Sequence, residues 1–301
     1  MMLRIERVEV VLNPKAGNDK LHKQLDQILA TLEHHFPFVN LYKTQDQGDA
    51  ARRIEQIGED VDLVIGAGGD GTIYELINAL APLDKRPAFG IIPAGTCNDF
   101  SRALGISQNP LIATEQICEQ QFRAIDVGKC EHQYFLNFWG IGLITDVSTN
   151  IDPKVKESLG RLSYYLSVFQ TVNEEKPFHL RIESKECSYE GDASMVLVGN
   201  GPFTGGIRAF FPGSDIEDGK LEVLVVESSR LQTFWDILRA KVMNNVPNNE
   251  GILYFQTEEV SIKTKPQRTI DCDGERTFQT PSTISILPAH INVAVGEYPV
   301  K

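Results

Sequence analysis

Several features that would assign this chain of 301 residues to other protein classes are scarce or missing. No apolar run approaches the ~20 residues that a helix needs to span a bilayer. The amino-terminal segment MMLRIERVEV lacks the layout of a signal peptide. The five cysteines form no C-x-x-C pair, and their odd number and scatter are typical of a reducing compartment. We therefore expect a cytoplasmic protein that does not cross the membrane.

Basic residues are fewer than acidic ones, and the formal net charge is -12. This charge argues against a nucleic-acid partner and against a general attraction to anionic membranes. Any membrane contact would need a local basic or apolar patch. Apolar residues make up 42% and charged residues 23%, which is ordinary for a globular protein. The length is sufficient for two domains.

The most informative stretch is VDLVIGAGGDGTIYELINAL, residues 61–80. Its apolar start predicts a buried parallel strand over 61–65. Four glycines follow within six residues, and apolar residues then recur at helical spacing over 73–80. Thr72 and Glu75 form a capping-box pattern, which predicts that the helix begins at this threonine. A helix start after glycines presents free N–H groups and suits a phosphate.

Asp70 decides which kind of phosphate site this stretch could be. The pattern G-x-G-x-x-G from Gly66 to Gly71 is by itself weak support for a dinucleotide site. A carboxylate inside a phosphate cradle repels the phosphate unless a cation lies between them. Asp70 therefore favours Mg²⁺ and a nucleoside triphosphate. The alternative is a tight turn in an α/β protein with a solvated acid.

The rest of the first half alternates strands with helices. We expect strands over 8–12, 39–43, 88–92 and 124–127, and helices over about 21–32, 48–57 and 110–119. Short loops between them predict a parallel, doubly wound sheet. Asn13-Pro14-Lys15-Ala16-Gly17, Thr44 and the segment 93–102 each follow a strand, where α/β proteins bind nucleotides. Turn formation and helix capping, by Asn98 and Asp99 in particular, are the alternatives.

The second half reads as short strands with turn signals, which predicts an antiparallel β-sandwich. The expected strands are 134–138, 178–183, 193–198, 220–227, 252–263, 268–272 and 283–287. Helices are expected over 155–172 and 231–244, and the first has an apolar face that is either core or a lid for an acyl chain. Lys154, Lys156 and Arg161 beside it could touch lipid headgroups or form a solvated face. The expected domains are 1–127 and 128–290.

Two loops of this half carry acids. Asp215-Ile216-Glu217-Asp218-Gly219-Lys220 concentrates three carboxylates, which suggests a hard-cation site or else a surface turn. Asp271-Cys272-Asp273-Gly274-Glu275 has the Asp-Gly of a hairpin turn between two strands.

Five segments, in order along nearly the whole chain, resemble the diacylglycerol kinase catalytic-domain family. The first matches its N-P-x-x-G at Asn13, Pro14 and Gly17. Gly68-Gly69-Asp70-Gly71-Thr72 is similar to its GGDGT motif, which NAD kinases, sphingosine kinases and, in variant form, phosphofructokinases share. Residues 93–102 match its P-x-G-T-x-N-D-F-A-R, with Ser101 as the departure. NAD kinases lack this decapeptide. Residues 137–146 resemble its N-x-x-G-x-G-x-D segment, and Glu275 matches its D-G-E. The match favours the bacterial soluble lipid-kinase branch (YegS/BmrU-like).

The resemblance implies a phosphofructokinase- and NAD-kinase-like first domain, on which residues 291–301 pack back, and roles for individual residues. ATP would be held by Asn13, Pro14, Lys15, Ala16, Gly17, Thr44, Gly68, Gly69, Asp70, Gly71, Thr72, Glu75 and Thr96. Asp70 would orient Mg²⁺, and Glu275 would be the general base. Asn98 and Asp99 would bind the acceptor. A structural Mg²⁺ would use Asp215, Asp218 and the backbone of Lys220.

The implied function is an ATP- and Mg²⁺-dependent lipid kinase of phospholipid metabolism. It would phosphorylate the primary hydroxyl of diacylglycerol or a related lipid, held in a cleft between the domains. Peripheral contact with the inner face of the cell membrane and a homodimer are further expectations. The alternatives are another GGDGT-type kinase, such as an NAD kinase or a sphingosine-kinase-like enzyme, or a nucleotide-binding sensor without turnover.

Overall fold

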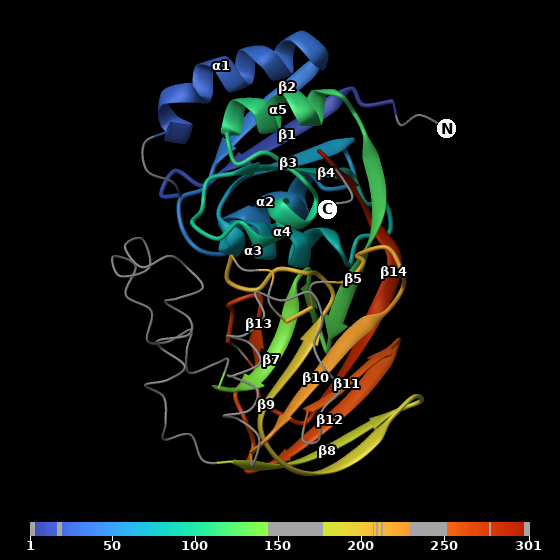
Figure 1. The fold of residues 1–301 in the computed structure, drawn as a ribbon. Helices are drawn as coiled ribbons and strands as arrows, with labels where there is room; N and C mark the ends of the chain where they lie inside the picture. The colour runs from blue at the N-terminus through green and yellow to red at the C-terminus, as the bar shows by residue number, and fades with distance from the viewer. Residues whose placement is uncertain are drawn as a thin grey trace. The chain divides into compact units, whose positions relative to one another are not determined.

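The computed structural model describes residues 4–16, 20–143, 177–206, 208, 210–211, 213–228, 252–276 and 278–297 (Figure 1). The contacts within the chain divide it into two compact units. The first consists of Met1–Asp126 with Ala289–Lys301, and the second of Val127–Pro288. Each unit is described by itself below.

The first unit is built on a parallel sheet with the strand order β4-β3-β1-β2. These strands are β1 (Arg7–Leu12), β2 (Phe38–Lys43), β3 (Leu63–Gly68) and β4 (Ala88–Pro93). Every residue of β3 and β4 is buried, as expected for the centre of a sheet that helices cover on both faces. The edge strand β2 is only partly covered.

Helices cover both faces of this sheet (Figure 1). One face packs against α1 (Lys20–His35) and α5 (Pro110–Cys118), and the other against α2 (Asp49–Ile57) and α3 (Asp70–Leu80). The short helix α4 (Asp99–Ala103) follows β4. Apolar side chains of β1, β3 and β4 form one core with Leu21, Ile28 and Leu32 of α1. The predicted α/β class of this unit is confirmed.

The second unit is mostly antiparallel, which is also as predicted. Its strands are β5 (Phe122–Cys130), β6 (Gln133–Phe135), β7 (Phe138–Gly142), β8 (Phe178–Ser184), β9 (Ser188–Gly199), β10 (Leu221–Glu227), β11 (Ile252–Thr257), β12 (Glu259–Lys265), β13 (Asp271–Cys272) and β14 (Ser282–Ala294). The long strand β9 changes neighbours along its length. Residues 188–193 pair with β8, whereas 195–199 lie between β7 and β10. The strand β9 therefore takes part in two groups of paired strands, one with β8 and one with β7 and β10.

Strands β5 and β14 both contain residues of the two units. At its carboxyl end β14 pairs in parallel with β4, where Val293 lies opposite Phe89. Val295 then donates its N–H to the carbonyl of Gln121 at 2.9 Å, and Gly296 donates to the carbonyl of Leu104 at 3.0 Å. The described end of the chain is thus tied to the first unit by backbone hydrogen bonds.

The structure corrects several expected element bounds. Residues 252–263 form β11 and β12, which are separated at Glu258, and 134–138 divide between β6 and β7. Only the last two residues of the expected strand 268–272 are a strand, and β14 extends past 287 to Ala294. The predicted helices over 155–172 and 231–244, with Lys154, Lys156 and Arg161, lie outside the described residues.

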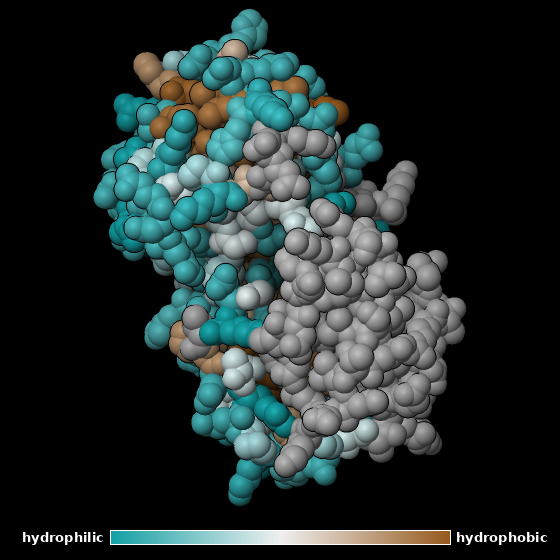
Figure 2. All heavy atoms as spheres, turned by 90° about the vertical axis from the view of Figure 1, so that its left-hand side faces the viewer, coloured by the Kyte–Doolittle hydropathy of each residue, from teal (hydrophilic) through white to brown (hydrophobic). Residues whose placement is uncertain are grey.

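Large apolar side chains reach the surface at few places in the described part of the chain. Phe38, Ile112 and Phe278 are exposed by 64%, 45% and 37%. On the face drawn in Figure 2, apolar residues gather at the upper end, the height at which Figure 1 shows α1, α5, β1 and β2. No described helix is long and apolar enough to cross a membrane.

Candidate functional site

The carboxyl ends of the four parallel strands bring the predicted nucleotide-binding segments to one edge of the sheet. Asn13 follows β1, Thr44 follows β2, Gly69 follows β3 and Ala94 follows β4. Backbone hydrogen bonds hold these segments together across the edge. Asn13 N donates to Ala67 O at 3.0 Å, Thr44 N to Leu12 O at 2.9 Å, and Ala94 N to Gly68 O at 2.8 Å. Ligand sites of open α/β sheets lie at such an edge.

The helix α3 begins at Asp70, two residues earlier than the capping-box pattern predicted. Its N-cap is Gly69, in an extended conformation, and no side chain caps the helix. Thr72 instead lies in the first turn, where its hydroxyl accepts a hydrogen bond from Asn13 Nδ2 at 3.0 Å. Glu75 is also engaged elsewhere, since its carboxylate accepts from Ala51 N at 3.0 Å. The first-turn N–H groups of α3 are therefore left for a ligand.

The carboxylate of Asp70 joins two loops of the first unit that contain glycine. One loop, at Gly68 and Gly69, precedes α3, and the other, residues 94–98, follows β4. We call them the glycine loops. Its Oδ2 accepts from Asn98 N and its Oδ1 from Asp99 N, both at 2.8 Å. Asp70 thus caps α4, and the side chain of Asn98, which we expected as a possible cap, does not. Each oxygen of an ionised carboxylate has two lone pairs, so Asp70 keeps acceptor capacity for a metal ion or its water. Its side chain is half-buried.

Glycines at 69 and 95 let the two loops touch through their backbones. A Cβ added to Gly95 would lie 2.6 Å from Gly69 Cα and 2.7 Å from Asn98 Oδ1. A Cβ on Gly69 would lie 3.1 Å from Gly95 Cα. Contacts under 3 Å do not occur for real Cβ atoms, so the approach requires glycine on at least one side. The loop 94–98 is therefore fixed against the start of α3.

Asn98 holds this second loop from inside. Its Oδ1 accepts from Gly95 N at 2.8 Å, and its Nδ2 donates to Gly95 O at 2.9 Å and to Gln108 Oε1 at 3.0 Å. Asn98 is in the left-handed region at φ 53°, a conformation that asparagine tolerates. Both amide N–H groups are thus used within the protein. Asp99 is 6% exposed, and Gln108 is a contributor that sequence reasoning missed.

The other predicted nucleotide-binding residues vary in exposure. Asn13 Oδ1 accepts from Lys15 N at 2.9 Å, which makes a turn at the end of β1. Lys15 and Thr96 are exposed, Pro14 and Ala16 are half-buried, and Thr44 is buried. Gly17 lies outside the described residues, and so does Asp146, the last residue of the segment 137–146. Gly66 belongs to β3, where an added Cβ would lie 2.8 Å from Leu76 Cδ1, so its role is close packing of α3 on the sheet.

In the second unit, Asp271–Glu275 forms the predicted hairpin turn. Cys272 and Glu275 exchange backbone hydrogen bonds at 2.9 and 2.8 Å. Asp273 and Gly274 lie between them with φ of 49° and 96°, the conformation that favours an Asp-Gly pair. Glu275, the predicted general base, is half-buried. Asp271 is 0% exposed, and its Oδ1 accepts from Gly274 N at 2.8 Å.

Asp273 fixes this turn, and the sequence reasoning gave it no role. Its carboxylate accepts backbone hydrogen bonds from Leu136 N at 2.7 Å, Asn137 N at 3.0 Å and Phe138 N at 2.8 Å. Asp273 N in turn donates to Phe138 O at 3.1 Å. These donors lie more than 130 positions away in the chain, so no local pattern could reveal the pairing. Glu275 therefore lies on a turn that is anchored to residues 136–138 through both the carboxylate and the backbone N–H of Asp273.

The acidic loop 215–220 forms local turns in this structure. Asp215 Oδ1 accepts from Glu217 N at 3.0 Å, and Asp218 Oδ1 accepts from Lys220 N at 2.9 Å. Each carboxylate keeps lone pairs that could serve a cation. Within the described ranges, no group of three or more His, Cys, Asp or Glu side chains is arranged to hold a metal ion. The structural Mg²⁺ at Asp215, Asp218 and Lys220 stays a prediction.

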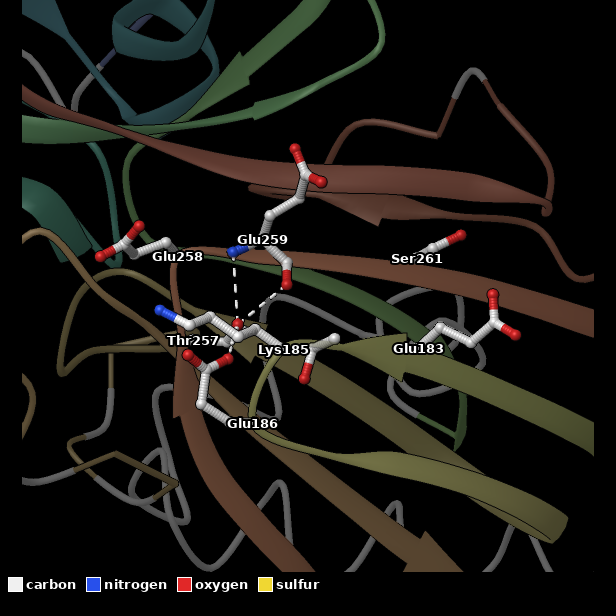
Figure 3. A pocket seen from close by; sticks show the side chains of 8 residues that line it. Glu183, Lys185, Glu186, Thr257, Glu258, Glu259 and Ser261 are labelled. Atoms are coloured by element: carbon white, nitrogen blue, oxygen red, sulfur yellow. Dashed lines mark hydrogen bonds between the residues drawn. The ribbon is translucent and has the colours of Figure 1, made fainter.

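The second unit has a hollow of about 350 Å³ whose lining, unlike the glycine loops, is rich in carboxylates (Figure 3). Figure 3 shows its glutamates around Lys185, with the hydroxyl of Thr257 bonded to Glu186. The lining residues are Glu183, Ser184, Lys185, Glu186, Thr257, Glu258, Glu259 and Ser261. Four carboxylates and one lysine would repel a triphosphate. This hollow is therefore a poor nucleotide site, and the carboxyl edge of the parallel sheet is the better one.

Comparison with known families agrees with these two halves. Residues 7–130 match the family described as the diacylglycerol kinase catalytic domain. Residues 142–295 match the family described as the YegS C-terminal NAD kinase beta sandwich-like domain. The first match contains both glycine loops and Asp70, and the second contains the acidic loop and Glu275.

Whole-chain comparisons give the same result. A diacylglycerol kinase of Bacillus subtilis (strain 168) is 31% identical over 97% of each chain. A diacylglycerol kinase of Staphylococcus aureus (strain bovine RF122 / ET3-1) is 30% identical, over 96% of this chain and 92% of its own. A crystal structure of a diacylglycerol kinase from Bacillus anthracis str. Sterne matches with a TM-score of 0.87 and 40% identity, over 99% of both chains. The chain belongs to the family of bacterial diacylglycerol and lipid kinases.

Proposed function

We propose that this protein is an ATP- and Mg²⁺-dependent lipid kinase that phosphorylates the primary hydroxyl of diacylglycerol or a related lipid. Family membership supports the reaction class. The observation that carries the proposal is the half-buried carboxylate of Asp70 at the uncapped start of α3. An anion at this place is useful to a triphosphate only through a cation.

In this proposal the triphosphate lies at the carboxyl edge of the parallel sheet. The first-turn N–H groups of α3 bind phosphate oxygens, and the positive end of the helix dipole adds to the attraction. Asn13, with Pro14, Lys15, Ala16 and Gly17, and the hydroxyls of Thr44 and Thr96 complete the nucleotide site. At Gly69 and Gly95 the backbones of the two loops approach each other with no side chain between them.

Asp70 has the chemistry to hold Mg²⁺, directly or through water. Two backbone N–H groups fix the orientation of its carboxylate, and acceptor capacity remains on both oxygens. When bound, Mg²⁺ neutralises the negative charge that develops on the transferring phosphoryl group. A carboxylate whose rotation is already restricted loses little entropy when it takes up the ion.

Glu275 is proposed as the general base that takes the proton from the lipid hydroxyl. Asp273 is its positioning residue, because three backbone N–H groups anchor the turn on which Glu275 lies. The proposal requires that Asp70 of the first unit and Glu275 of the second serve the same reaction.

The remaining roles are assigned by domain. Residues 1–127, with 291–301, would bind ATP, and residues 128–290 would bind the lipid from a peripheral position on the inner face of the membrane. Asn98 and Asp99 would contact the acceptor. Asn98 already uses both of its amide N–H groups and one lone pair of Oδ1 within the protein. The second lone pair of Oδ1 is what it would offer to the acceptor. Asp215, Asp218 and the backbone of Lys220 would hold a structural Mg²⁺.

The test is phosphate transfer from labelled ATP to a panel of acceptors, with Mg²⁺ present or chelated. The panel contains diacylglycerol, phosphatidylglycerol and sphingosine in mixed vesicles, and NAD in solution. We expect a labelled lipid that depends on Mg²⁺. Transfer to NAD alone would replace the lipid-kinase proposal with that of another GGDGT-type kinase. ATP binding without transfer to any acceptor would indicate a sensor.

A further inference from the structure

Asp49 is a nearly buried acid that none of the roles above uses. It is the first residue of α2 and is only 7% exposed. Aspartate is rarely buried to this degree unless its charge has partners. Thr44, a residue of the proposed nucleotide site, lies in the loop that joins β2 to α2, just before Asp49. The partners of this carboxylate therefore bear on how that threonine is held.

Both oxygens of Asp49 accept hydrogen bonds from residues in or beside this loop. Oδ2 accepts from the backbone N–H of Gln45 at 2.9 Å. Oδ1 accepts from the hydroxyl of Tyr42 at 3.1 Å and from Nη2 of Arg52 at 3.0 Å. The bond from Gln45 is the main reason, ahead of those from Tyr42 and Arg52, that the pKa of Asp49 lies below its ordinary value. The carboxylate is therefore ionised at neutral pH.

These bonds fix the backbone on both sides of Thr44. Its own N–H donates to Leu12 O at 2.9 Å, and the next N–H, that of Gln45, donates to Asp49. The hydroxyl is less firmly held, because Oγ1 lies 3.4 Å from Leu12 O, beyond the ordinary range of about 2.5–3.0 Å for an O–H···O bond. The backbone of Thr44 is therefore fixed, while its hydroxyl can turn to a ligand at little cost.

The start of α2 is itself tied to the helix that begins at Asp70. Glu75 of α3 accepts a hydrogen bond from Ala51 N at 3.0 Å, and α2 packs against α3 (Figure 1). A displacement of Asp49 relative to the first turn of α3 is thereby restricted. Asp49 therefore links the position of Thr44 to the N–H groups that are proposed to bind phosphate.

From these contacts we infer that Asp49 is a positioning residue of the nucleotide site, which holds Thr44 in the orientation that binds ATP. The inference rests on the proposed function, because it takes the hydroxyl of Thr44 as a contact of the nucleotide. The charge of Asp49 acts in the opposite direction, since a carboxylate near a triphosphate repels it. Removal of Asp49 therefore weakens ATP binding if its role is positioning, and strengthens ATP binding if only its charge counts.

The experiment measures the dissociation constant of ATP by calorimetry, with Mg²⁺ in excess. Asp49→Ala should raise this constant about tenfold, as expected for the loss of one hydrogen bond to a charged group. Asp49→Asn keeps an oxygen for Gln45 N and should show a smaller rise. The matched control is Asp46→Ala, which removes an equal charge from the same loop. The Asp46 carboxylate bonds to Arg52 rather than to the loop backbone, so this variant should bind ATP as well as the wild type or better.

A double-variant cycle tests whether Asp49 acts through Thr44. Thr44→Val keeps the shape of the side chain and loses the hydroxyl, and it should raise the dissociation constant by a similar factor. Asp49→Ala should then add little in the Thr44→Val background, because residues that act as one unit are not additive. At saturating ATP, kcat of Asp49→Ala should stay within about twofold of the wild type, so that the loss appears in KM for ATP.

Unchanged or tighter ATP binding in both Asp49→Ala and Asp49→Asn would overturn the inference, and so would fully additive effects of Asp49→Ala and Thr44→Val. Thermal unfolding checks each variant, and Asp49→Asn decides if Asp49→Ala does not fold. ATP binding does not depend on the acceptor. A wild type that binds ATP and phosphorylates no lipid would therefore refute the proposed function, and the dissociation constants would still decide the inference. A wild type that does not bind ATP would overturn both.

Discussion

A methyl group at position 95 should separate the two loops of the proposed nucleotide site. In Gly95→Ala the new Cβ would lie 2.6 Å from Gly69 Cα and 2.7 Å from Asn98 Oδ1, both far inside van der Waals contact. Gly69 is backbone and Asn98 is held by three hydrogen bonds, so neither neighbour moves without cost. The loops must part by roughly 1 Å, and a displacement of that size at a reacting centre can cost ~100-fold in rate.

The effect on stability should be smaller than the effect on catalysis. Overpacking of this kind costs about 1–3 kcal/mol, part of which the exposed loop relieves by moving outward. Gly69→Ala, with its contact at 3.1 Å, should show an intermediate loss of activity. Gly213→Ala is the matched control, because nothing lies within 4 Å of its added Cβ.

The assays are kcat and KM for ATP in the transfer reaction, together with thermal unfolding of each variant. We expect the order Gly95→Ala, Gly69→Ala, Gly213→Ala from largest to smallest loss of kcat/KM. Wild-type kcat/KM in Gly95→Ala with normal folding would refute the role of the close backbone approach.

Three further predictions concern other parts of the chain. Asp273→Ala should lower the free energy of unfolding by about 3–5 kcal/mol in urea denaturation, because three backbone donors lose a charged acceptor. Asp273→Asn keeps one acceptor oxygen and should lose less stability. Equal stability of Asp273→Ala and wild type would contradict the anchoring role. The pKa of His179 should be found above its ordinary value by NMR titration, because Glu190 and, next, Asp192 accept hydrogen bonds from its ring. The stabilisation from this contact is complete below the unfolded-state pKa and is lost as the pH rises through the raised pKa, and Glu190→Gln should bring the pKa back toward ordinary. Asp218→Ala should abolish any rise in melting temperature that Mg²⁺ gives the wild type, whereas an identical Mg²⁺ response in both proteins would remove the proposed structural site.

The features that follow from local pattern could be predicted from the sequence. The parallel strands of the first unit and their helices come from short-range apolar periodicity, and the Asp-Gly hairpin from a two-residue preference. The capping-box prediction at Thr72 was wrong because a residue far away in the sequence bonds to the threonine hydroxyl. Asn13, 59 positions away, takes up the threonine hydroxyl, and Gly69 starts the helix without a side-chain cap.

The same limit explains what was missed in the candidate site. Asp70 was selected for its charge among glycines, but its bonds to the backbone of Asn98 and Asp99 cross 28 and 29 positions. Asp273 looked like an ordinary turn residue, and its three backbone partners are more than 130 positions away. A side chain recruited by distant backbone leaves no periodicity or spacing in the sequence.

The bonds of Asp70 also complicate the obvious variant. In Asp70→Asn one oxygen becomes an N–H₂ group that faces a backbone N–H, so lost activity alone could reflect a displaced α4. Dependence on metal concentration separates the two explanations, because a purely structural role does not change it.

The most direct test of the account is therefore the Mg²⁺ dependence of phosphate transfer from ATP to diacylglycerol in wild type and Asp70→Asn. We predict turnover lower by orders of magnitude in the variant, with the half-saturating Mg²⁺ concentration raised about tenfold or more and the protein still folded at the assay temperature. An unchanged Mg²⁺ dependence with near-normal turnover would contradict the role of Asp70 as the partner of the metal.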